Sequence, residues 1–147
     1  MELDSKIALL YDKDSSVAYK NLQELESFSD TAEGLYPYFD EFLAMLGSEK
    51  YVLRVRGFRL LCKQAKWDTE NKIDREIESI LRAVDDEKPT AVRQKLTALE
   101  DIVRYKKALH SKIRDKMLSL DYLRFKDTMH SLIEQDIQSL LQVMERK

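Results

Sequence analysis

The sequence is poor in the residues that interrupt helices or crosslink folds. Its 147 residues include three glycines, two prolines and one cysteine. So little glycine and proline is typical of a mostly helical protein with short connections. The single cysteine, Cys62, excludes an intramolecular disulfide and a metal site built from several cysteines. The glycines at positions 34, 47 and 57 lie too far apart to form a phosphate-binding loop.

Long apolar runs are also missing. No stretch approaches the roughly 18 apolar residues of a membrane-spanning helix. The first residues, MELDSKIALLYDKD, are acidic and turn polar at once, unlike a signal peptide. We therefore expect a cytoplasmic protein, complete because predicted helices lie at both ends. One domain over residues 1–147 can bury roughly 68–70% of its unfolded surface, which makes a metal or disulfide unnecessary for folding.

Apolar residues recur at helical spacing and predict eight helices and no strand. The helix that organises the chain runs from Ser48, a candidate cap, to Trp67. Gly47 is expected to end the preceding helix in a left-handed conformation. The apolar face of the helix at 48–67 comprises Val55, Phe58, Leu61, Cys62 and Ala65. The other helices are expected at residues 4–12, 15–28, about 35–46, about 69–85, from 89 to between 104 and 111, 111–120 and about 128–145.

An internal repeat links two of these helices. A shift of 38 residues places Phe58 on Leu96 and Trp67 on Tyr105. A period near 40 made of two antiparallel helices is typical of a helical solenoid. The segment KPTAVRQKLTAL, residues 88–99, resembles the second helix of a HEAT repeat, in which a proline opens the helix and a Val-Arg pair follows. Tyr51 stands where that motif has proline.

The resemblance implies an all-α, right-handed HEAT-like superhelix of about four helix pairs. The stretches WDTENKI, residues 67–73, and DEKPTAVRQ, residues 86–94, are also similar to small uncharacterised bacterial HEAT-like proteins, some of which carry an iron–sulfur-assembly ("SufBD") label. Cys62 alone gives that label no chemical support. HEAT-like proteins mostly bind other proteins, and one branch, DNA glycosylases, binds DNA on its concave face. No residue match here carries the base-excision chemistry of that branch.

The charge is unevenly distributed although the net charge is only −2. Residues 1–49 carry eleven acids and three bases, and residues 68–87 carry eight acids and three bases. Residues 50–67 carry six bases and no acid, and residues 88–116 carry nine bases and three acids. Because second helices line the concave face of a HEAT solenoid, this predicts a basic groove that attracts an acidic segment of a protein partner or a phosphate backbone. Alternatively, neighbouring acidic and basic helices simply pair across the surface.

Eight residues are the candidate partner-binding site, with Lys107 extending the basic surface. They are Tyr51, Arg54, Arg56, Arg59, Lys63, Trp67, Arg93 and Lys95. Trp67 could instead cap the core between repeats. Nucleic acid is the alternative ligand, although the acidic chain lacks the basic excess of a nucleic-acid binder. Weak self-association through terminal helices is also expected, because solenoid ends leave apolar faces uncovered.

No residue pattern indicates catalysis, a cofactor or a metal. His110 and His130 lack metal-binding spacing, and Asp85-Asp86-Glu87 is interpreted as a charged turn before Pro89. Cys62 is expected to be a buried small hydrophobe. Gly57, inside a predicted helix, indicates close helix packing or close approach of a ligand. We therefore expect a non-enzymatic interaction module.

Overall fold

The computed structural model describes residues 2–146, which form helices and turns but no strand. The all-α class and the number of eight α-helices are confirmed, with four short 3-10 helices, η1 to η4, at helix ends. No helix within this range is both long enough and apolar enough to cross a membrane. The α-helices are α1 Leu3–Ala8, α2 Ser15–Thr31, α3 Phe39–Met45, α4 Tyr51–Lys63, α5 Lys72–Arg82, α6 Pro89–Tyr105, α7 His110–Ser119 and α8 Asp127–Glu145.

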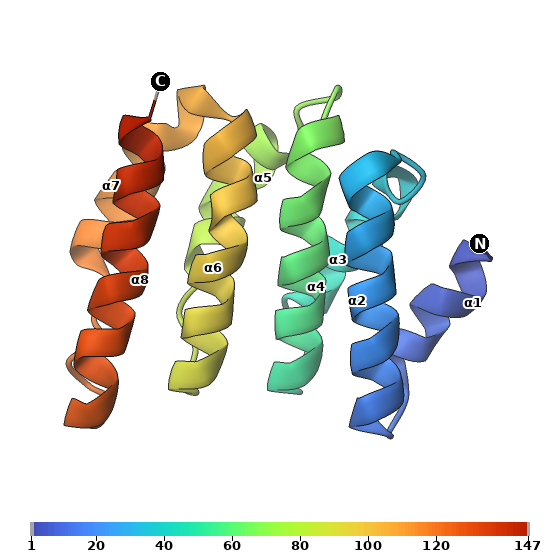
Figure 1. Ribbon diagram of the computed structural model, residues 1–147, viewed down its shortest axis with the longest axis horizontal. Helices are drawn as coiled ribbons and strands as arrows, with labels where there is room; N and C mark the ends of the chain where they lie inside the picture. The colour runs from blue at the N-terminus through green and yellow to red at the C-terminus, as the bar shows by residue number, and fades with distance from the viewer. Residues whose placement is uncertain (1, 147) are drawn as a thin grey trace.

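The helices form two layers (Figure 1). Helices α2, α4, α6 and α8 stand side by side with nearly parallel axes, and all four begin at the lower edge of the view. We call these four the front layer. Helices α3, α5 and α7 lie behind it and run in the opposite direction. The core fills the space between the layers, with Phe39, Phe42, Phe58 and Ile77 among its buried side chains.

The front helices repeat with the period found in the sequence. Helices α4, α6 and α8 begin at residues 51, 89 and 127, so each starts 38 residues after the one before. Hydrogen bonds connect positions that lie 38 residues apart: the Trp67 indole donates to the Ser29 carbonyl, and the Arg124 guanidinium donates to the Asp86 carbonyl. Equivalent positions of successive repeats are therefore in contact.

The same turn precedes three of the front helices. A side-chain oxygen of Asp12, Ser48 or Asp86 accepts a hydrogen bond from the amide two residues later, and the helix begins one residue beyond that amide. Such turns are a known use of short polar side chains. The prediction that the organising helix begins at Ser48 was wrong in this respect, because Ser48 shapes the turn and α4 starts at Tyr51.

Two glycines differ in the space around them. A Cβ atom at Gly57 would lie 2.5 Å from Met45 Cβ and 2.9 Å from the Phe42 carbonyl oxygen, so α4 touches α3 closely at this point. This confirms close packing as the reason for Gly57. Gly47 does not adopt the predicted left-handed conformation. Within the described chain no glycine has a positive φ, and Asn71, at 54°, is the one residue that does.

We predict that Gly57→Ala lowers the free energy of unfolding by about 2–3 kcal/mol, because the added methyl group would overlap Met45 and the α3 backbone. Urea denaturation of both proteins measures the change. Gly47→Ala is the matched control, since its Cβ would meet one oxygen, that of Ala44, at 3.7 Å. Equal stability of the two variants would contradict close α3–α4 packing.

Asp86 joins neighbouring repeats from a buried position. Its carboxylate accepts hydrogen bonds from Arg54 of α4, from the Lys88 amide at the start of α6, and from Lys95, at 3.1–3.2 Å. Burial alone would raise the pKa of Asp86, but these donors, Arg54 first among them, lower the pKa to about 2. Lys95 is itself only 1% exposed and also donates to the Ala83 carbonyl. Its charge is stable there because Asp86 is ionised.

We predict that Asp86→Asn destabilises the protein by about 3 kcal/mol at pH 7, because it leaves buried Lys95 without a countercharge. Since the pKa of Asp86 in the folded protein is about 2, below its ordinary value, the stability it contributes is full above pH 4 and is lost as pH falls toward 2. Urea unfolding at pH 2–7 should therefore show the two proteins converging in acid. Asp85→Asn, which removes the exposed pair with Lys116, should change little.

Candidate functional site

Two adjoining pockets open between α2, α4 and α6. The upper pocket, about 500 Å³, lies along the C-terminal halves of α2 and α4. The lower pocket, about 430 Å³, lies at the N-terminal starts of the same helices. Arg59 and Gln94 line both pockets.

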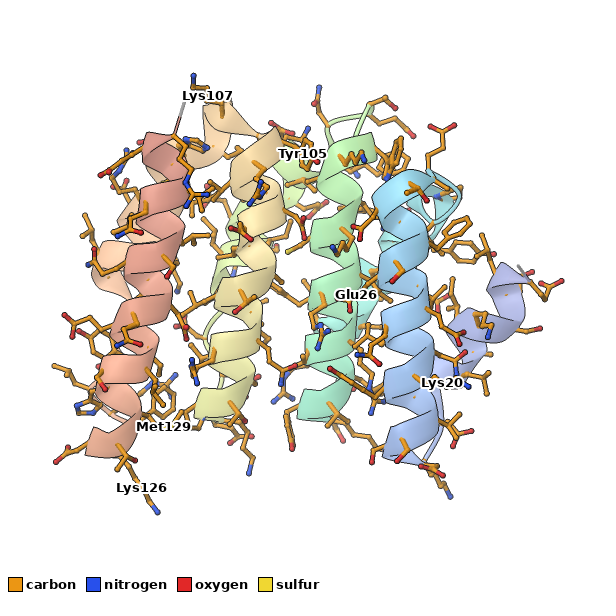
Figure 2. All side chains as sticks on the ribbon, viewed as in Figure 1. Lys20, Glu26, Tyr105, Lys107, Lys126 and Met129 are labelled. Carbon is orange, nitrogen blue, oxygen red and sulfur yellow. The ribbon has the colours of Figure 1, made fainter. Side chains whose placement is uncertain are left out.

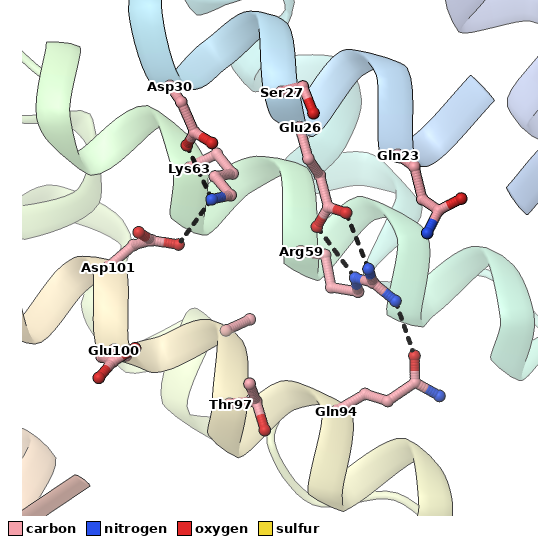
Figure 3. A pocket seen from close by; sticks show the side chains of 11 residues that line it. Gln23, Glu26, Ser27, Asp30, Arg59, Lys63, Gln94, Thr97, Glu100 and Asp101 are labelled. Carbon is pink, nitrogen blue, oxygen red and sulfur yellow. Dashed lines mark hydrogen bonds and ion pairs between the residues drawn. The ribbon is translucent and has the colours of Figure 1, made fainter. Parts of the chain in front are cut away.

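A chain of hydrogen bonds crosses the three helices where the pockets meet (Figure 3). Glu26 of α2 accepts two bonds from Arg59 of α4, at 2.8 and 3.0 Å. Arg59 donates a third bond, of 3.0 Å, to Gln94 of α6. The Arg59 guanidinium is thus held by its neighbours and does not project freely from the surface.

The upper pocket holds a second, weaker charge bridge. Lys63 of α4 lies 2.8 Å from Asp30 of α2 and 3.9 Å from Asp101 of α6 (Figure 3). With Glu26 and Glu100, four acids line this pocket against two bases, Arg59 and Lys63. In this part of the surface, acids of the neighbouring helices meet the basic row of α4, as the alternative of paired acidic and basic helices predicts.

Of the four carboxylates in the upper pocket, Asp101 is the one whose ionised form its surroundings stabilise least. Burial, together with the nearby charges of Asp30, Glu100 and Glu26, raises the pKa of Asp101 to about 6, and Lys63 offsets only part of this effect. Two further carboxylates of the same pocket, Glu26 and Asp30, are within 2.8 Å of a base. Asp101 thus carries an ionisation cost near neutral pH.

The other predicted basic residues lie in different surroundings. Arg54 and Lys95 pair with Asp86, and Arg93 pairs with Asp136 of α8 at 2.7 Å. The predicted place of Lys95 on an open groove was wrong, because its side chain points to the loop between α5 and α6. Arg56 is also buried, at 8% exposure, instead of exposed in a row with Arg59.

Arg56 differs from the other five predicted bases of α4 and α6. Its Nη1 donates to the Leu10 carbonyl at 2.7 Å, and no carboxylate among residues 2–146 forms an ion pair with it. Burial lowers the pKa of the Arg56 guanidinium, because desolvation disfavours its charged form. Arg56 lines the lower pocket, so it is a buried cation beside an open cavity.

The lower pocket has a different chemistry from the upper one. Its wall contains two arginines, Arg56 and Arg59, and no acid. Two exposed aromatic rings stand on it, those of Tyr19 (48% exposed) and Tyr51 (38% exposed). The ammonium group of Lys88 lies 5.6 Å from the Tyr51 ring centre. The remaining lining residues are Ser15, Ser16, Leu22, Val52, Val55 and Gln94.

Trp67 and Lys107 lie outside both pockets. The half-buried Trp67 indole donates to the Ser29 carbonyl at 2.7 Å, so it joins α2 to η3, Gln64–Trp67. This position agrees with the alternative that Trp67 caps the core between repeats, and not with Trp67 as a partner-binding residue in the groove. Lys107 lies beyond the upper end of α6, at the opposite edge from Lys126 (Figure 2).

Sequence reasoning missed the α2 side of the surface. Tyr19, Gln23, Glu26 and Asp30 follow one another at spacings of 4, 3 and 4, which places them on one face of α2. That acidic face opposite the basic row of α4 was the signal for paired charges. Leu118, in the last turn of α7, and Leu123, between α7 and α8, are 74% and 67% exposed. The self-association predicted for the terminal helices stays a prediction.

Within residues 2–146, no group of three or more His, Cys, Asp and Glu side chains has an arrangement suited to a metal ion. Cys62 is fully buried, and burial raises the pKa of its thiol. Comparisons with known protein families, with curated proteins and with solved structures find no match to this chain. The geometry of the two pockets is therefore the basis for an argument about function.

We predict that Asp101→Asn stabilises the protein on the order of 1–2 kcal/mol above pH 7. The pKa of Asp101 in the folded protein, about 6, is raised, so ionising it costs stability as pH rises from 4 through 6. The variant escapes that cost, and the two proteins should be equally stable near pH 4. Urea unfolding from pH 4 to 8 measures the difference. Asp115→Asn, at an exposed site on α7, should show no such trend.

Proposed function

We propose that this protein is a HEAT-like helical-repeat module that binds an acidic segment of a protein partner on its front layer and performs no catalysis. The 38-residue repeat, the parallel front helices and the HEAT-like segment at 88–99 support the HEAT-like assignment. The binding surface is the lower pocket together with the adjoining ends of α2 and α4.

The observation that carries this proposal is the charge of the lower pocket. It is lined by two arginines and no carboxylate, whereas the upper pocket has twice as many acids as bases. An acidic segment would therefore be attracted to one part of the front layer and repelled from the adjoining part. Exposed Tyr19 and Tyr51 supply the amphipathic rings that are enriched at protein interfaces.

Nucleic acid is the weaker candidate for the same surface. A duplex presents a regular row of phosphates and needs several cations in line. The row on α4 is interrupted, since Arg59 and Lys63 are bound to carboxylates of α2. The lower pocket offers one cation without a carboxylate, Arg56, which suits a single acidic side chain better than a phosphate backbone.

Selection of displayed 12-residue peptides on the whole protein tests the proposal. We predict that the selected peptides are enriched in Asp and Glu, and that Ser16→Glu weakens their binding by about 10-fold or more. Ser16 is exposed on the lower pocket, in the first turn of α2, where a new carboxylate would repel acidic ligands and reach toward Arg56. Fluorescence anisotropy with the selected peptides measures the loss.

Thr128→Glu is the matched control, because Thr128 is also exposed and is also the second residue of a front helix, α8. It should bind the peptides as the wild type does. Selection of basic peptides, or equal binding by both variants, would sink the proposal. Tight binding of a 20-base-pair duplex that falls steeply between low and physiological salt would favour nucleic acid instead.

A further inference from the structure

Arg56 is the most unusual charged side chain of the front layer. It is more than nine-tenths buried, yet it lines a pocket of about 430 Å³ that opens to solvent. One guanidinium nitrogen, Nη1, is hydrogen-bonded, to the Leu10 carbonyl. Every other predicted base on α4 and α6 reaches a carboxylate within 3.1 Å. The pocket is thus the place where the described chain keeps a desolvated cation without a countercharge.

The chemistry of guanidinium indicates what fits this position. Arginine carries five donors in a planar fork that matches the two oxygens of a carboxylate, and such charge-assisted pairs are short and strong. Withdrawing the cation from water disfavours its charge, and an incoming anion removes that penalty. The first turn of α2, which also reaches the pocket through Ser15 and Ser16, adds little to this attraction, because the Asp14 carboxylate already caps it and accepts from the Ser16 amide at 2.9 Å.

The wall around Arg56 indicates what should accompany the anion. Leu22, Val52 and Val55 form apolar lining, and the Tyr19 and Tyr51 rings stand on the rim. A carboxylate by itself would leave this apolar surface in contact with water. A bulky apolar group beside the carboxylate would cover it.

We propose that Arg56 is the anchor for one carboxylate of the partner segment and that a bulky apolar or aromatic residue next to this acid packs against Val52 and the two tyrosines. This inference rests on the proposed function and deepens it by naming the anchor and the recognised pair of side chains. The acids of the upper pocket exclude further negative charge beyond the Glu26–Arg59–Gln94 chain. The segment should therefore place its acids over the lower pocket and neutral or basic residues over the upper one.

A small probe tests the anchor without requiring a partner. We expect 3-phenylpropanoate, which joins one carboxylate to one ring, to bind with a dissociation constant of about 1 mM. Titration followed by NMR should shift the Arg56 Nε–Hε signal together with the amide signals of Val52 and Tyr19. The uncharged 3-phenylpropanamide should bind at least about 10-fold more weakly, because it lacks the anion.

Three variants separate recognition from folding. Arg56→Met should abolish saturation by 3-phenylpropanoate, and Arg56→Lys, which keeps the charge but loses the fork, should weaken it several-fold. Val52→Ala keeps Arg56 intact. It should weaken the binding of 3-phenylpropanoate and leave the binding of acetate, which has no ring, unchanged. Arg93→Met is the control, since Arg93 pairs with Asp136 away from the lower pocket. Circular dichroism identifies any variant that fails to fold, and Val52→Ala then decides the question.

The outcomes distinguish this inference from the proposed function. If acidic peptides bind and Ser16→Glu abolishes their binding, but 3-phenylpropanoate leaves the Arg56 signal unmoved, the anchor is wrong and the function stands. If neither the acidic peptides nor 3-phenylpropanoate binds, both the Arg56 anchor and the proposed function are overturned. Saturation by phenyl phosphate without saturation by 3-phenylpropanoate would overturn the carboxylate assignment in favour of a phosphorylated ligand. Equal binding of the charged and uncharged probes would show an apolar pocket in which Arg56 plays only a structural part.

Discussion

The structure depends on one buried carboxylate, that of Asp86. It lies between α5 and α6 and is bonded to α4 through Arg54, to the first turn of α6 through the Lys88 amide, and to Lys95 in the core. Its backbone carbonyl accepts from Arg124, which precedes α8. One aspartate thereby fixes where α6 begins and joins three successive repeats. A buried ammonium such as that of Lys95 is compatible with folding only because this carboxylate is ionised beside it.

Charge pairing across the front layer follows from the repeat. Because α2, α4 and α6 run parallel, side chains about 33–38 residues apart lie at the same height on neighbouring helices, as Glu26, Arg59 and Gln94 do. Acids of α2 therefore meet bases of α4, and the net charge of each helix says little about the net charge of the surface. Such pairs are individually weak, but they align the helices and leave few charges free.

The sequence was sufficient to predict the helices and the period, since both follow from apolar spacing along the chain. It also indicated that Gly57 lies at a close helix contact. It was misleading for Gly47 and Ser48, because several conformations can end or begin a helix. It left open whether the bases of α4 and α6 line a groove or pair with neighbouring acids. The direction in which a long side chain leaves its helix decides whether Lys95 reaches solvent or Asp86, and that direction depends on loops distant in sequence.

The contrast between two buried cations shows why pairing matters more than the number of bases. Lys95 and Arg56 are both withdrawn from water, but Lys95 has Asp86 at 3.1 Å and Arg56 has one backbone carbonyl, that of Leu10. Burial lowers the pKa of both side chains, and for Lys95 the carboxylate opposes this effect. The free protein therefore bears a desolvation cost at Arg56 that no internal group removes. A carboxylate supplied from outside would remove it, so the unpaired cation identifies the surface on which a ligand gains most.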